Sequence, residues 1–115
     1  GVQYDPTKEI VGGSDPIRFL EKVLPRVVTM TASDRSLAPG ATIDDLRQSD
    51  GAVGYSDKLR HGEVGLGLID YDTIFRMLAA GSYAGWISVE DGMNGMDELQ
   101  RSVTFLHTKV LQYYG

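Results

Sequence analysis

The apolar positions of the chain repeat with two periods, one typical of buried strands and one typical of helices. Residues 27–32 (Val-Val-Thr-Met-Thr-Ala) are apolar or β-branched and carry no charge. Such a run predicts a strand of a parallel sheet that is covered on both faces. Residues 85–90 predict a second strand of this kind, and residues 2–7 predict a shorter strand that is stopped by Pro6.

A helix is predicted between the first two of these strands in chain order. It follows the loop signal Gly12-Gly13, takes Ser14 or Asp15 as its cap, and ends at Pro25. Its apolar residues recur at helical spacing, so one face of this helix is expected to pack on the sheet.

The middle of the chain, residues 36–67, is rich in Gly, Asp and Ser and predicts a long loop, with at most a short helix at residues 42–48. A second helix is expected to begin at Asp70 or Asp72 and to stop at Gly81. A last helix places four apolar side chains along one stripe: Leu99, Val103, Leu106 and Val110.

The elements follow one another as strand, helix, strand, loop, helix, strand and helix. Helical crossovers between strands predict a right-handed parallel sheet and an α/β fold. A chain of 115 residues is expected to form a single domain, residues 1–115. Trp86 opens the third strand and is expected to pack against a helix, with stacking on a sugar ring as the alternative.

Composition limits the classes of function. The net charge is −5, the isoelectric point is near 4.8, and Lys and Arg are scattered, which argues against a nucleic-acid partner. No apolar run approaches the roughly 20 residues of a membrane span. Cysteine is absent, so disulfides, thiolate metal sites and a cysteine nucleophile are excluded, and a cytoplasmic location is expected.

Acidic side chains follow each predicted strand. Asp5 follows the first strand, Asp34 the second and Glu90 the third. Because parallel strands end at one edge of their sheet, these carboxylates are expected to converge there. Carboxylate oxygens suit a hard divalent cation, although a full site needs more donors. The alternative is that each acid caps the helix that follows it.

The residue order adds a resemblance that covers nearly the whole chain. Residues 30–35 (Met-Thr-Ala-Ser-Asp-Arg), Gly65-Leu66-Gly67 before residues 70–72, and residues 85–92 resemble the sugar-phosphate isomerase/epimerase family of xylose isomerase-like TIM barrels. Within that group the chain is most similar to the catalytic subunits of C-glycoside deglycosidases. The resemblance implies a partial TIM barrel, namely about three C-terminal βα units.

The resemblance also implies a divalent metal site for Mn²⁺ or Mg²⁺, with Asp5 and Glu90 as ligands and Glu90 also in a catalytic role. Thr31 stands where relatives commonly carry a metal-binding histidine, and Lys8 stands where many have another. A hydroxyl is a poor ligand beside imidazole. The family's first metal glutamate would lie on an earlier strand. The site in this chain is therefore expected to be incomplete and its metal binding weak.

Other positions are matched to a sugar or sugar phosphate. Arg35 falls where the family often holds the substrate, and its guanidinium suits a phosphate or carboxylate, although an exposed loop arginine is an equal alternative. Asp34 beside it is expected to bind substrate as well. His61 lies in the long loop and could act as a catalytic acid or base.

Three βα units cannot close an eight-stranded barrel. The open edges and uncovered sheet face predict association, either as a homo-oligomer or with a complementary N-terminal half-barrel. Two functions stay open at this point. The chain is part of a metal-dependent isomerase, epimerase or related carbohydrate lyase, or it is a non-catalytic assembly or sugar-binding subunit derived from that fold.

Overall fold

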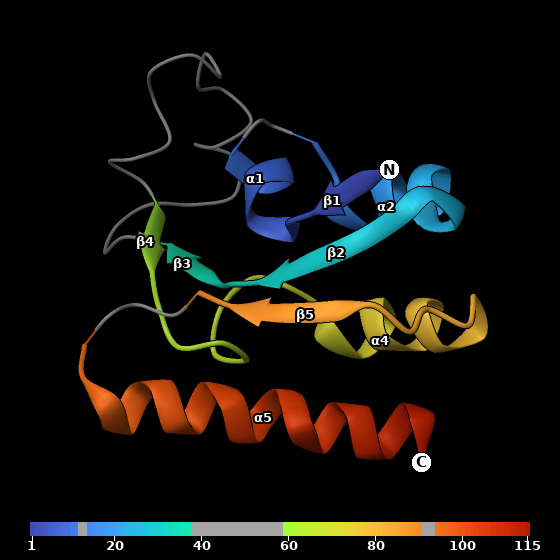
Figure 1. The fold of residues 1–115 in the computed structure, drawn as a ribbon. Helices are drawn as coiled ribbons and strands as arrows, with labels where there is room; N and C mark the ends of the chain where they lie inside the picture. Colours follow the sequence, from blue (N-terminus) through green and yellow to red (C-terminus); the bar gives the residue numbers. More distant parts are fainter. Residues whose placement is uncertain (12–13, 38–58, 91–93) are drawn as a thin grey trace.

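The computed structural model describes residues 1–11, 14–37, 59–90 and 94–115 (Figure 1). Strands and helices alternate along most of the chain. In chain order the elements are β1 (Val2–Tyr4), α1 (Pro6–Val11), α2 (Pro16–Val23), the 3₁₀ turn η1 (Leu24–Arg26), β2 (Val27–Ala32), β3 (Arg35–Leu37), β4 (Leu59–His61), α4 (Tyr71–Ala80), β5 (Trp86–Val89) and α5 (Met96–Tyr114).

The main sheet has three parallel strands in the order β1-β2-β5. Helices flank it, and the fold is therefore α/β and matches part of a TIM barrel, as the sequence predicted. The strand predicted at residues 27–32 is β2, which lies in the centre of the sheet. A register shift between Val2 and Gln3 interrupts the pairing of β1 with β2.

The two faces of the sheet differ in polarity. Tyr4, Met30 and Ile87 lie side by side in register on the face that the helices cover, and Tyr4 and Met30 are fully buried. The opposite face carries the alternate positions of the strands. These are mostly polar: Gln3, Thr29, Thr31, Trp86 and Ser88. This face is thus less apolar than the uncharged run of residues 27–32 indicates, because Thr29 and Thr31 of β2 lie on it.

Trp86 lies on this open face, in register with Thr29, and is 82% exposed. The prediction that it packs against a helix is wrong. The cause is the alternation of side chains along β5, which turns Ile87 towards the helices and Trp86 away from them.

Local signals explain the helix ends. Asp15 caps α2, because its Oδ1 accepts a hydrogen bond from the Ile17 N–H (2.9 Å), and Asp70 caps α4 by accepting from the Thr73 N–H (3.1 Å). Gly81 is the C-cap of α4, as predicted. The helix α1 is not among the predicted elements, because a proline after a strand-like run also signals the end of a strand. Pro6 is in fact the first residue of the helix, where a missing N–H costs nothing.

Two short strands fall in or overlap the long loop predicted over residues 36–67, whereas residues 62–67 form no helix or strand, as predicted. Residues 35–37 form β3 and residues 59–61 form β4, and the two strands pair antiparallel. The short helix predicted at residues 42–48 lies outside the described residues. The sequences of these short strands are Arg-Ser-Leu and Leu-Arg-His, which show no hydrophobic alternation. They are recognised as strands only because they pair with each other.

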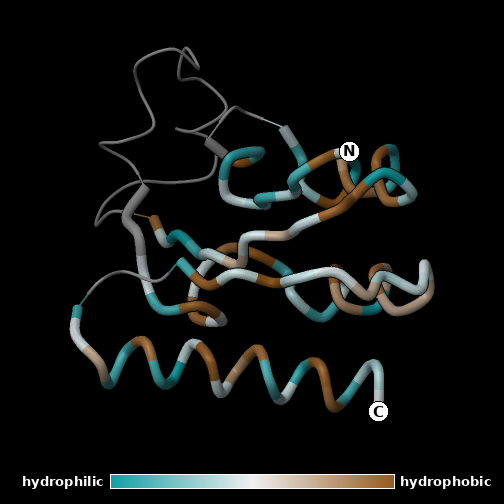
Figure 2. Tube along the Cα trace, viewed as in Figure 1, coloured by the Kyte–Doolittle hydropathy of each residue, from teal (hydrophilic) through white to brown (hydrophobic). Residues whose placement is uncertain are grey.

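The longest helix, α5, packs against α4 and differs from the predicted stripe. Val103 is 47% exposed, whereas Ser102 and Leu106 are buried. Ser102 belongs to the buried face because its Oγ accepts the N–H of Val64 (3.1 Å). Figure 2 shows the hydrophobic residues of α5 as separate bands along the helix. No helix in the described part of the chain is both long and apolar enough to cross a membrane.

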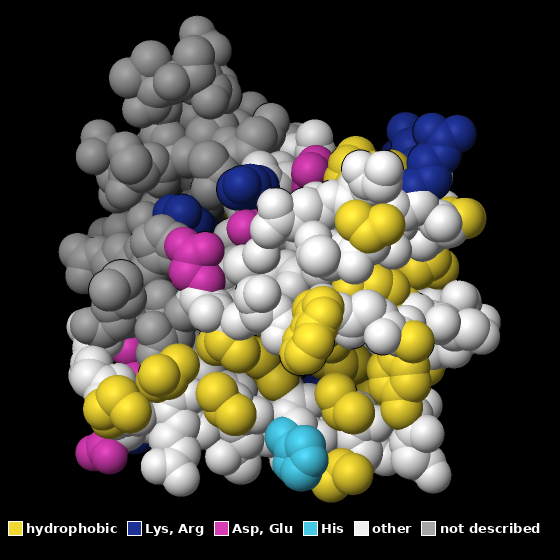
Figure 3. All heavy atoms as spheres, in the orientation of Figure 1, with side chains coloured by type: hydrophobic (Ala, Val, Ile, Leu, Met, Phe, Trp, Pro, Cys, Tyr) yellow, Lys and Arg dark blue, Asp and Glu magenta, His cyan; other side chains and the backbone are white. Residues whose placement is uncertain are grey.

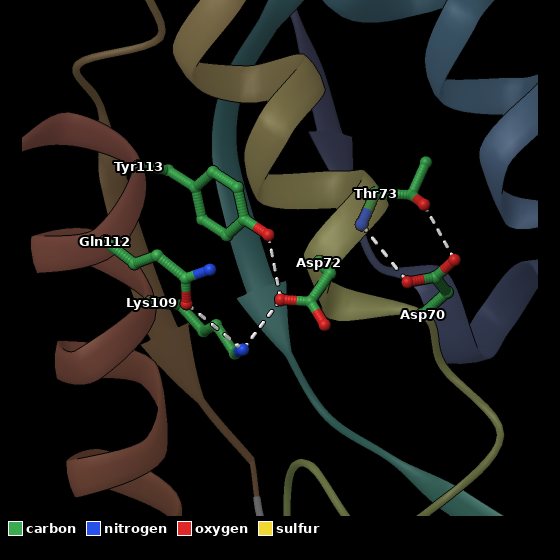
Figure 4. Close-up of polar contacts among 6 residues, drawn as sticks. All are labelled: Asp70, Asp72, Thr73, Lys109, Gln112 and Tyr113. Carbon is green, nitrogen blue, oxygen red and sulfur yellow. Dashed lines mark hydrogen bonds and ion pairs between the residues drawn. The ribbon is translucent and has the colours of Figure 1, made fainter.

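A polar contact joins the start of α4 to the end of α5 (Figure 4). The Asp72 carboxylate accepts hydrogen bonds from Lys109 Nζ (2.6 Å) and from the Tyr113 hydroxyl (2.8 Å). The two donors hold the pKa of Asp72 below its ordinary value, with the Lys109 bond as the larger cause. This bridge links the two helices at the surface.

Candidate functional site

The three predicted acids lie at one edge of the sheet. Asp5 follows β1, Asp34 comes two residues after β2, and Glu90 follows β5, and all three strands run in the same direction. The Glu90 N–H donates to the Ala32 carbonyl (2.8 Å), which extends the pairing of β2 and β5 to this edge. The prediction that the acids share an edge is confirmed by the strand directions, and their roles stay predictions.

Asp5 is held by a buried network of hydroxyl groups. Its Oδ1 accepts from the Thr7 N–H (3.1 Å), the Thr7 hydroxyl (2.9 Å) and the Ser33 hydroxyl (3.0 Å), and the two hydroxyl oxygens lie 2.7 Å apart. The hydrogen bond from the Thr7 N–H also makes Asp5 the N-cap of α1. Capping of the following helix was the alternative role expected for this acid. Among the described residues, these hydrogen bonds of the carboxylate all go to Oδ1.

Thr31 is the residue that replaces a family histidine, and it is engaged within the chain. Its Oγ1 accepts a hydrogen bond from the Gln3 side-chain amide (2.8 Å) on the open face of the sheet. Sequence reasoning missed Gln3, as well as the Ser33 and Thr7 hydroxyls around Asp5. Gln3 could have been found from strand alternation, because it lies one position before the apolar Tyr4.

Glu90 is exposed at the end of β5. Its neighbours at residues 91–93 lie outside the described residues. Glu90 therefore presents a carboxylate at the same edge as Asp5 with free access from solvent, whereas Asp5 presents a fixed and nearly buried one.

Asp34, which was predicted to bind substrate, is engaged within the chain, and its substrate role stays a prediction. It is 1% exposed, and its two carboxylate oxygens accept four backbone N–H groups. Oδ1 accepts from Arg35 (3.0 Å) and Ile69 (3.2 Å), while Oδ2 accepts from Gly65 (2.9 Å) and Gly67 (3.1 Å). The side chain therefore anchors the segment 65–69 to the end of β2.

The environment of Asp34 is closely packed. Burial raises the pKa of its carboxyl, and the four backbone donors oppose that shift. A Cβ at Gly67 would lie 2.2 Å from Asp34 Oδ1, so only glycine lets the backbone approach this closely. The buried Tyr71 hydroxyl donates to the Ser33 carbonyl, and burial, followed by the nearby Asp34 charge, raises the pKa of Tyr71.

Arg35 was predicted to bind substrate and His61 to act as a catalytic acid or base. The two residues are 26 positions apart in the sequence, and they are paired opposite each other in the antiparallel strands β3 and β4. The Arg35 carbonyl also accepts the N–H of Leu68 (2.8 Å). The backbone thus brings both residues close to Asp34, whose carbonyl accepts the Gly62 N–H (3.2 Å). The His61 side chain lies outside what the structure describes. Lys8 lies exposed on α1.

A complete metal site does not fit the described donors. Within residues 1–11, 14–37, 59–90 and 94–115, no three His, Asp or Glu side chains come together in a group that could hold a metal ion. Asp5 and Glu90 supply two carboxylates, and the Thr31 hydroxyl is bonded to Gln3.

Comparison with solved structures gives a similarity of fold. No family model and no curated protein matches the chain. Among solved structures, the chain is similar to a xylose isomerase domain protein from Planctomyces limnophilus, with a TM-score of 0.75 and 20% sequence identity. The match covers 99% of this chain and 37% of that one. The chain thus has a xylose isomerase-like fold and spans little more than a third of the length of that neighbour.

Proposed function

We propose that this chain supplies the sugar-binding edge of a xylose isomerase-like barrel, and that its substrate is a sugar or a sugar phosphate. The observation that supports this most is the Asp5 carboxylate, which Ser33 and Thr7 hold at the strand edge that it shares with Glu90. A carboxylate whose position is fixed before binding accepts hydrogen bonds from sugar hydroxyls without an ordering cost.

The roles at this edge follow from chemistry and position. The Asp5 and Glu90 carboxylates accept hydrogen bonds from neighbouring hydroxyls of the sugar. Arg35 binds the phosphate of a phosphorylated sugar, because a guanidinium offers paired donors to such a group. In a full barrel, Glu90 or His61 moves the proton that an isomerase or epimerase must transfer. The finer resemblance to C-glycoside deglycosidases belongs to the same proposal.

A second candidate is a non-catalytic subunit that binds sugar or assembles with other chains. The bond from Gln3 to Thr31 favours it, because this pair occupies the position of a family metal ligand with two neutral groups. Joining the chain to the earlier strands of a related barrel and assaying sugars with Mn²⁺ separates the candidates. Turnover that Glu90→Gln abolishes supports the enzyme, and binding without turnover supports the subunit.

The binding itself is tested by NMR titration of the chain with D-xylose and with ribose 5-phosphate. Shifts of amide signals near residues 5, 33 and 90 are expected, and Asp5→Asn and Glu90→Gln should each weaken binding about tenfold, the effect of losing one hydrogen bond to a charged group. Arg35→Gln should weaken only the phosphate ester. Asp97→Asn, on the exposed first turn of α5, is the control. Equal shifts in all variants would rule out this site.

A further inference from the structure

Ser33 joins the end of β2 to the Asp5 carboxylate. Its hydroxyl donates to Asp5 Oδ1 (3.0 Å), and the residue is fully buried. The bonds that Thr7 makes to the same oxygen come from only two positions further along the segment that contains Asp5. Ser33 therefore connects the acid to a different strand, and the place of the carboxylate depends on where Ser33 is held.

The pairing of β2 with β5 stops before Ser33. Ala32 is the last residue of β2 and is paired with Val89. The Ala32 carbonyl accepts the Glu90 N–H, whereas the Ser33 carbonyl accepts the hydroxyl of a side chain 38 positions away, that of Tyr71. The place of Ser33 thus depends on Tyr71 as well as on the strand.

Tyr71 carries its hydroxyl from the packed helices to the end of β2. It is the first residue of α4 and is buried. Its ring packs on Phe75 of α4, with centroids 6.2 Å apart, and edge-on against Phe105 of α5, at 5.9 Å. Burial, followed by the nearby Asp34 charge, raises the pKa of Tyr71, so the hydroxyl keeps its proton and stays a donor. The two helices therefore hold this donor against Ser33.

The residues just before Tyr71 are tied to the same turn of the chain. Gly67 and Ile69 donate their N–H groups to the Asp34 carboxylate, at 3.1 and 3.2 Å. The start of α4 and residues 33–35 are thus joined both by backbone donors and by the Tyr71 hydroxyl. A displacement of one of these two segments moves the other.

The acids at the strand edge are open to a ligand, whereas the residues that support them are not. Glu90 is exposed, and a small part of Asp5 reaches the surface. Figure 3 shows acidic and basic side chains close to one another over the ends of β1 and β5. Ser33 and Tyr71 are buried behind this surface, so their effect on a bound sugar must pass through Asp5.

We propose that Tyr71 is a positioning residue for the sugar site: it holds Ser33, whose hydroxyl in turn keeps the Asp5 carboxylate in place. The inference rests on the proposed function for the identity of the ligand. Its contacts run from the interface of α4 and α5 to the strand edge, so the packing of these helices controls the geometry of the acid. Loosening the carboxylate adds an ordering cost to binding and lowers affinity.

Tyr71→Phe tests the proposal, because it removes the hydroxyl and keeps the ring. In NMR titrations with D-xylose it should weaken binding about threefold to tenfold, the effect of one hydrogen bond. Tyr83→Phe is the matched control, since the Tyr83 hydroxyl also donates to a backbone carbonyl, that of Trp86 (2.6 Å), at the other end of β5. This variant should bind D-xylose as the wild type does, and an equal loss in both variants would contradict the proposal.

A double-mutant cycle separates positioning from a general loss of stability. If Tyr71 acts through the Ser33 hydroxyl, Tyr71→Phe should weaken binding in the wild-type chain and have little further effect in Ser33→Ala. Additive losses would overturn the positioning role, because a general structural effect does not need the Ser33 hydroxyl.

The amide signal of Thr7 gives a readout that needs no sugar, because this N–H donates to Asp5 Oδ1 (3.1 Å). Tyr71→Phe should shift the signal, and Tyr83→Phe should leave it unchanged. If the signal shifts as expected but the wild type does not bind D-xylose, the link from Tyr71 to Asp5 is supported and the proposed function is refuted.

Gly67→Ala disturbs the same turn from its other side, because a Cβ there would meet the Asp34 carboxylate. It should also shift the Thr7 signal, and it keeps the test decisive if Tyr71→Phe does not fold. Gly62→Ala is its control, since a Cβ at Gly62 meets no atom of the described residues within 4 Å. A Thr7 signal that stays in place in Gly67→Ala and in every folded Tyr71 variant would overturn the proposal.

Discussion

At the scale of single residues, the approach of Gly67 to Asp34 makes the strongest prediction about stability. Gly67→Ala would place a Cβ 2.2 Å from Asp34 Oδ1 and 2.4 Å from the Arg35 carbonyl. The segment must then move away and leave a buried carboxylate with fewer donors. We expect the free energy of unfolding to fall by about 2–4 kcal/mol. Urea denaturation followed by circular dichroism measures this.

The matched control for this change is Gly62→Ala, since a Cβ at Gly62 meets no atom of the described residues within 4 Å. Its effect should stay within about 0.5 kcal/mol. Trp86 fluorescence is a poor probe here, because the ring is already exposed in the folded chain. Equal losses in the two alanine variants would show that the contact with Asp34 does not hold the segment.

Ser82 makes a second prediction of opposite sign. It has a φ of 57°, in the left-handed region, directly after the C-cap Gly81, and the Tyr83 N–H closes the helix end on Leu78 (2.9 Å). Glycine is the residue preferred at this position. Ser82→Gly should raise the free energy of unfolding by about 0.5–1 kcal/mol. Ser88→Gly, in the strand β5, should not stabilise, and a gain there as well would refute the backbone explanation.

At the scale of elements, Asp72 couples α4 to α5. Its pKa is lower in the folded chain than in the unfolded one, so its stabilisation is present above the ordinary value of about 3.9 and is lost as the pH falls through the lower folded value. Asp72→Asn should cause a small loss of stability at neutral pH, as is typical of exposed ion pairs, and should remove this part of the acid dependence.

Thermal unfolding at several pH values measures the effect of Asp72, and added salt should reduce the difference from the wild type. Glu21→Gln, on the exposed side of α2, is the control, because Glu21 does not lie at the contact between α4 and α5. A difference between the wild type and Asp72→Asn that persists unchanged at low pH would contradict the assignment.

At the scale of the whole molecule, metal binding depends on donors from several strands at once. We expect calorimetry with Mn²⁺ to show weak or absent binding by this chain, because Asp5 and Glu90 provide only two carboxylates. Thr31→His should not restore tight metal binding in this chain. The same substitution should restore it only when the earlier strands of a barrel are also present. Sub-micromolar affinity that Asp5→Asn or Glu90→Gln abolishes would contradict this prediction.

Several features of this protein follow from the sequence alone. The run of β-branched residues in β2 predicted that strand at its observed bounds. Each pair of cap candidates, Ser14 or Asp15 and Asp70 or Asp72, included the observed cap, and Gly81 marked the end of α4. These features depend on neighbours within a few positions, so local chemistry specifies them. The order of strands and helices then implied the parallel sheet, and with it the shared edge of Asp5 and Glu90.

Other features were decided by tertiary structure. Asp34 resembles a ligand-binding residue in the sequence, but donors from residues 65–69 enclose it, and their approach depends on the fold. The exposure of Trp86 depends on which face of β5 the helices cover, and the strand pair β3–β4 joins segments more than 20 positions apart. Contacts between distant segments leave no periodic signal, so hydrophobic pattern and local propensity determine elements but not these partners.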